Sequence, residues 1–189
     1  MDLTRSLVEA KAGEYEESQP LAAVEQEHVE MLPEMFAEGE FGWRDVEWVV
    51  QWYFRRYLGA YPDSERRETE AAFGDNTYEE VMDVLSAVYT ADDVDEKLRQ
   101  LLTLDGVDVG VGSAFLQFMY PEVYIAVDSR VWGILYDTGE LDWPYPDDPS
   151  VEEYVTYHET CRELADQFDI DTYTLYRALW QLGSEGADG

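Results

Sequence analysis

Asp128 is the residue of this sequence whose position best suits chemistry. It follows the apolar run 123–127 and precedes a segment, from Ser129 onward, in which helical periodicity resumes. An aspartate at such a boundary is well placed to cap a helix, and capping alone stabilises by about 1 kcal/mol. The helix dipole also favours a negative charge there. A cap alone and a reactive carboxylate are therefore both open interpretations.

Three arginines are candidates for contacts to phosphate groups. Arg55 and Arg56 are adjacent in a chain with few bases, and Arg130 lies two residues beyond Asp128. Arginine suits phosphate because its planar fork binds two oxygens at once. The alternative is that these side chains form ion pairs with neighbouring acids, because helical spacing brings such pairs together.

Aromatic side chains offer a place for a base to stack. Trp52, Tyr53 and Trp132 are the candidates, and packing in the core is the alternative for each. No metal site is predicted, because Cys161 is the single cysteine and no carboxylate spacing fits a calcium loop. A single cysteine also excludes an internal disulfide.

The elements that position these residues are predicted to be helices. Apolar residues recur at helical spacing between turn signals, so the fold class is all-α, in one domain over 1–189. Helices are expected over 2–11, 20–32, 44–58, 65–73, 78–89, 94–102, from about 150, and 171–183. Gly13 and Gly183 are read as helix ends, Pro33 as a break or a kink, and the tail 184–189 as frayed. The run 123–127 is the best candidate for a strand.

The segment 104–135 differs from the rest of the chain. It begins L-D-G-V-D-V-G-V-G at 104–112, where Gly106 falls in a turn and Gly110 and Gly112 lie at the start of the next helix. Small residues there let two backbones approach closely, which predicts a tight helical hairpin. Pro121 follows that helix, and then the apolar run leads to Asp128.

This segment resembles the helix-hairpin-helix DNA glycosylase superfamily, of the endonuclease III type. The resemblance implies DNA contacts at Gly106, Gly110 and Gly112, and a catalytic role for Asp128 beside the glycosidic bond of a flipped nucleotide. It also implies a monovalent cation on hairpin carbonyls, for which we expect potassium. The lysine of bifunctional members is Gly110 here, so no lyase chemistry through a Schiff base is expected. Asp108 replaces the second hairpin glycine and would repel a phosphate.

The net charge of the chain indicates the salt concentration in which the protein works. Forty-three acids against 12 bases give −31, only two of the bases are lysine, and the acids are spread evenly. Molar salt screens such repulsion, so we predict a halophilic protein. The sequence has no transmembrane run and begins without a signal-peptide pattern, which predicts a cytoplasmic protein with no membrane partner.

Two functions follow as hypotheses from different classes. One is a monofunctional base-excision glycosylase that acts on DNA through Asp128. The other is a non-catalytic helix-hairpin-helix scaffold that binds nucleic acid weakly or binds a protein partner. Asp108 and Gly110 favour the scaffold, whereas Asp128 and its surroundings favour the enzyme. The sequence does not indicate an oligomeric state.

Overall fold

The computed structural model describes residues 2–187, which form ten α-helices and no strand. The all-α prediction is confirmed. The helices are α1 (Arg5–Ser18), α2 (Ala22–Glu38), α3 (Trp43–Arg55), α4 (Asp63–Gly74), α5 (Tyr78–Thr90), α6 (Val94–Leu101), α7 (Val109–Met119), α8 (Ser129–Thr138), α9 (Val151–Phe168) and α10 (Thr172–Ala187).

Polar side chains at the N-caps explain why most of these helices begin where they do. An oxygen of the capping side chain accepts a hydrogen bond from a backbone N–H of the first turn, which would otherwise be unsatisfied. The caps of this kind are Thr4, Thr77, Asp93, Asp108, Asp128 and Ser150. The interpretation of Asp128 as an N-cap is therefore confirmed.

Two expected helix ends do not occur, and Pro33 does not end its helix. Helix α1 continues through Gly13 to Ser18, α2 contains Pro33, and α10 passes Gly183 to reach Ala187. Tertiary packing explains α1, whose apolar face against α10 offsets the cost of about 1 kcal/mol for a glycine within a helix. Residues 184–187 of the tail expected to fray are helical, and 188–189 lie outside the described residues.

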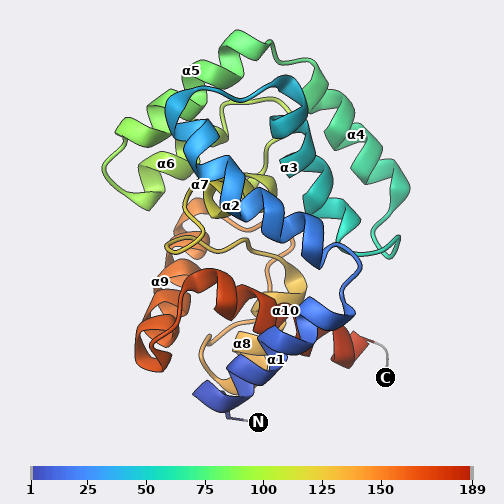
Figure 1. Ribbon diagram of the computed structural model, residues 1–189, viewed down its shortest axis with the longest axis vertical. Helices are drawn as coiled ribbons and strands as arrows, with labels where there is room; N and C mark the ends of the chain where they lie inside the picture. The colour runs from blue at the N-terminus through green and yellow to red at the C-terminus, as the bar shows by residue number, and fades with distance from the viewer. Residues whose placement is uncertain (1, 188–189) are drawn as a thin grey trace.

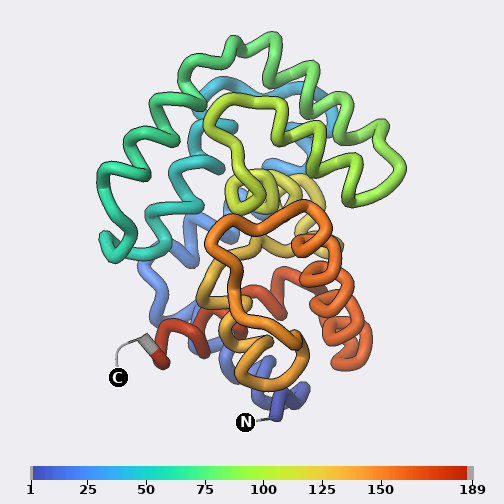
Figure 2. The backbone as a smooth tube through the Cα atoms, turned by 180° about the vertical axis from the view of Figure 1, so that it is seen from behind, coloured from blue at the N-terminus to red at the C-terminus, as the bar shows by residue number. Residues whose placement is uncertain are grey.

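The helices form two groups, which contact each other where α6 meets α9 and where α1 meets α2 (Figures 1 and 2). Helices α2 to α6 surround the upper end of the molecule in Figure 1, whereas α1, α8, α9 and α10 form the lower end. Every residue of α7 is buried. The chain passes from α7 to the lower group along residues 120–128, so Asp128 stands where the two groups meet.

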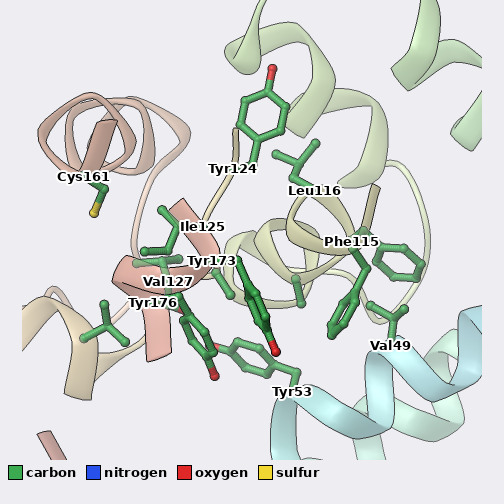
Figure 3. Close-up of a cluster of buried hydrophobic side chains, with 14 of the residues drawn as sticks. Val49, Tyr53, Phe115, Leu116, Tyr124, Ile125, Val127, Cys161, Tyr173 and Tyr176 are labelled. Carbon is green, nitrogen blue, oxygen red and sulfur yellow. The ribbon is translucent and has the colours of Figure 1, made fainter. Parts of the chain in front are cut away.

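The apolar run 123–127 is not a strand, because side chains satisfy its backbone. Residues 124–127 are buried, whereas Val123 is exposed. Three tyrosine hydroxyls donate to the carbonyls of 125–127, and two side-chain oxygens accept from the N–H groups of 126 and 127, so the buried part needs no partner strand. The donors are Tyr53, Tyr154 and Tyr157, and the acceptors are Ser113 Oγ and Gln117 Oε1. Figure 3 shows Tyr53 extending from α3 towards Val127.

Candidate functional site

Asp128 is buried with both carboxylate oxygens engaged. Its Oδ1 accepts from the backbone N–H of Arg130 at 2.8 Å and of Val131 at 3.0 Å. Its Oδ2 lies 2.8 Å from Nη1 of Arg56. The side chains of Asp128 and Arg56 are each 1% exposed. Asp128 therefore caps α8 and forms a buried ion pair with Arg56, two residues that are 72 positions apart in sequence.

Aromatic rings enclose the guanidinium of Arg56. Five ring centres lie between 4.4 and 5.9 Å from its Cζ atom, and each ring attracts the cation through its negative face. These rings belong to Trp52, Tyr53, Tyr57, Tyr176 and Trp180. Arg56 Nε donates to the carbonyl of Tyr53, and Nη1 donates to the hydroxyl of Tyr176. A phosphate cannot reach a guanidinium held in this way.

Glu25 is a second buried carboxylate near Arg56. Its Oε2 accepts from Tyr15 Oη at 2.8 Å and from Trp52 Nε1 at 2.7 Å, and its Oε1 accepts from Tyr173 Oη at 2.7 Å. Burial raises the pKa of Glu25, and the three hydrogen bonds and the positive charge of Arg56 counteract that rise. Sequence reasoning missed Glu25, because a glutamate on an amphipathic helix ordinarily faces water.

A pocket of about 150 Å³ lies beside Asp128. Its walls are mainly tyrosines and aspartates from the end of α3, the start of α7, the start of α8 and the loop before α9. The lining residues are Tyr53, Tyr57, Tyr61, Asp108, Val109, Gly110, Asp128, Ser129, Tyr145, Asp147, Asp148 and Pro149. We call this cavity the tyrosine pocket.

The tyrosine pocket carries an excess of negative charge. Asp108, Asp147 and Asp148 line it, and none of them forms an ion pair with a residue in 2–187. The pKa of Asp108 is raised, first because the protein partly removes its carboxylate from water, and further because Asp148 carries a like charge nearby. No lysine or arginine is among the lining residues described. This wall repels an anion.

The hairpin glycines serve contacts inside the protein. A Cβ atom at Gly106, whose φ is +73°, would meet the backbone of α4 at Phe73. One at Gly110 would overlap the hydroxyl of Tyr53, and one at Gly112 would lie 2.7 Å from Leu98 Cδ1. All three glycines, predicted as DNA contacts, are thus explained by close approach between helices.

The two other predicted phosphate ligands lie apart from the tyrosine pocket. Arg55 is exposed, forms no ion pair with residues 2–187 and lines a separate cavity with Arg66 and Asp63. Arg130 is half-buried, lies over the rings of Tyr57 and Trp180, and donates to Ser184 Oγ at 3.2 Å. The predicted set Arg55, Arg56 and Arg130 therefore does not form one basic surface.

Only one of the three predicted stacking residues lines the pocket. Tyr53 does so, whereas Trp52 and Trp132 are buried in the core, with their indole N–H groups bonded to Glu25 and to the carbonyl of Trp143. Sequence reasoning missed Tyr57, Tyr61 and Tyr145. Tyr57 lies four residues after Tyr53 in the helix expected over 44–58, and this spacing was a signal for it. Tyr61 follows the turn at Leu58 and Gly59, and no local signal indicated it.

Residues 2–187 contain neither a metal-binding cluster nor a membrane-spanning helix. No cluster of three or more His, Cys, Asp or Glu side chains is arranged to hold a metal ion. No helix is both long enough and apolar enough to cross a membrane.

Comparison with known proteins gives no match: no family model fits the sequence, and no curated protein or solved structure is significantly similar to it. The resemblance to helix-hairpin-helix glycosylases therefore depends on the residues 104–131 alone.

Proposed function

We propose that this chain is a binding protein built on a glycosylase-like helix-hairpin-helix scaffold, and that it does not hydrolyse glycosidic bonds. One observation carries the proposal: the carboxylate of Asp128 is committed to the cap of α8 and to the buried pair with Arg56.

A glycosylase needs a carboxylate that is free to face the sugar. Turning Asp128 Oδ2 towards a substrate would leave Arg56 buried without that counterion, and breaking a buried pair costs roughly 3–5 kcal/mol. The phosphates of a nucleic acid would also meet Asp108, Asp147 and Asp148 at the pocket. Both features favour binding without catalysis, in the salt-rich cytoplasm that the composition predicts.

One feature favours the second candidate, a monofunctional base-excision glycosylase acting on DNA. Asp128 is among the residues that line the tyrosine pocket, at the start of a helix as the resemblance requires. A rotation of Arg56 would then free the carboxylate, with a potassium ion expected at the hairpin carbonyls. No lyase activity accompanies this candidate, because position 110 is glycine.

A base-release assay in molar KCl decides between the two. Single-stranded and duplex DNA carrying a broad panel of damaged bases is incubated with the wild-type chain and with Asp128→Asn. We expect no release above the uncatalysed background from either. Release by the wild type that is lost in a folded Asp128→Asn variant would overturn the proposal and establish the glycosylase.

A further inference from the structure

The tyrosine pocket combines phenol rings with exposed carboxylates that form no ion pair among residues 2–187. We propose that it binds a small organic cation, of the size of a quaternary ammonium group such as the head of choline. This assignment rests on the proposed binding function and names the class of ligand.

The aromatic walls are the first reason. Tyr53, Tyr57, Tyr61 and Tyr145 converge on the pocket. The guanidinium of Arg56 already lies over Tyr53 and Tyr57, but no cationic side chain in residues 2–187 lies over Tyr61 or Tyr145. Rings of this kind attract weakly hydrated cations, and quaternary ammonium ligands are typically held in aromatic cages.

Charge is the second reason. Arg56 compensates Asp128, so the charges of Asp108, Asp147 and Asp148 dominate the pocket. A cation in the pocket would offset the like charges of Asp108 and Asp148, whereas an anion or a neutral ring would not.

Size limits the ligand further. A cavity of about 150 Å³ holds a molecule of the size of benzene. A trimethylammonium group is of similar size to benzene, whereas a whole nucleotide is too large for this cavity. A bare alkali ion prefers a close shell of oxygens and would leave the rings without a role.

Titration with choline tests the assignment. Choline chloride replaces KCl at constant molar ionic strength, and binding to the full chain is followed by calorimetry and by tyrosine and tryptophan fluorescence. We expect saturable binding of one choline per chain, and no saturation with the neutral isostere 3,3-dimethylbutan-1-ol. Absence of saturation by choline, or equal binding of the isostere, would overturn the proposal. A response to exchange of potassium for sodium, without one to choline, would also overturn it.

Matched variants locate the site. Asp108→Asn with Asp148→Asn removes two charges while asparagine keeps the N-cap of α7, so the folded variant should bind choline at least tenfold more weakly. Asp83→Asn, an exposed residue of α5, should change binding less than twofold. Tyr61→Phe should retain binding, and Tyr61→Leu should weaken it at least fivefold. Equal affinity in all four variants would exclude this pocket.

The base-release assay and the choline titration test different claims, so their failures can be told apart. Base release that depends on Asp128 would overturn the absence of catalysis and leave the choline titration to be judged by itself. Choline binding that is absent while no base is released would remove only the ligand class.

Discussion

At the scale of single residues, Asp128 and Arg56 depend on each other. The carboxylate caps α8 through Oδ1 and pairs with the guanidinium through Oδ2. Arg56 brings its charge into a shell of five rings, where water is excluded and an unpaired charge is costly. The pair therefore explains why a buried arginine is tolerated next to the tyrosine pocket.

A double-variant cycle on this pair gives the residue-scale prediction. Asp128→Asn keeps a good N-cap but leaves Arg56 without its partner, so the free energy of unfolding should fall by about 3–5 kcal/mol. Adding Arg56→Met removes the second charge, and the double variant should be more stable than Asp128→Asn alone. Urea denaturation in molar KCl measures each value. A double variant that is no more stable than the single one would contradict the ion-pair account.

At the scale of helices, the hairpin glycines allow the segment 106–112 to pack closely against α3, α4 and α6. Gly110 lets α7 pass the end of α3, where the hydroxyl of Tyr53 donates to the carbonyl of Val127 at 3.0 Å. That hydrogen bond ties α3 to the segment that leads into Asp128. The hairpin glycines thus fix the position of the candidate site from within the protein.

Two glycine-to-alanine substitutions test whether Gly110 is needed for the close contact with Tyr53. Gly110→Ala should lower the free energy of unfolding by about 1–3 kcal/mol, because the new methyl group overlaps Tyr53. Gly133→Ala in α8 is the control, since nothing lies within 4 Å of the added atom. It should raise the free energy of unfolding by about 0.5–1 kcal/mol, because alanine favours a helix. Similar effects at both positions would contradict the proposed close contact.

At the scale of the whole molecule, the net charge of −31 opposes folding through self-repulsion. Salt weakens that repulsion, since the Debye length falls from about 10 Å at 0.1 M to about 3 Å at 1 M. Every ion pair among residues 2–187 except Asp128–Arg56 is at least partly exposed, and exposed pairs add little stability. We therefore expect the fold to gain more from screening than it loses from weakened pairs.

The midpoint of thermal unfolding should accordingly rise with KCl between 0.2 and about 3 M. A variant with four exposed acids neutralised should show a smaller rise, because less repulsion remains to be screened. The substitutions are Glu34→Gln, Asp83→Asn, Glu122→Gln and Asp137→Asn, none of which removes an ion pair with the described residues. A midpoint that falls as KCl is added would contradict the halophilic interpretation.

The sequence by itself determined the features that depend on neighbouring residues. Helical periodicity and polar caps predicted an all-α chain, the starts of α5 and α6, and Asp128 as a cap. These properties are local, because a side chain and the first turn of its own helix decide them. Where packing overrode a local signal, as at Gly13 in α1, the prediction was wrong.

Only the tertiary structure decided which distant residues meet. The partner of Asp128 is Arg56, the hairpin glycines face other helices, and the pocket unites Tyr61 with Tyr145 and Asp148. No local rule connects these positions, because they come together only when the two groups of helices have formed and pack against each other. Packing of the same helices places the carboxylate of Asp128 beside the buried guanidinium of Arg56, so this carboxylate serves as a counterion.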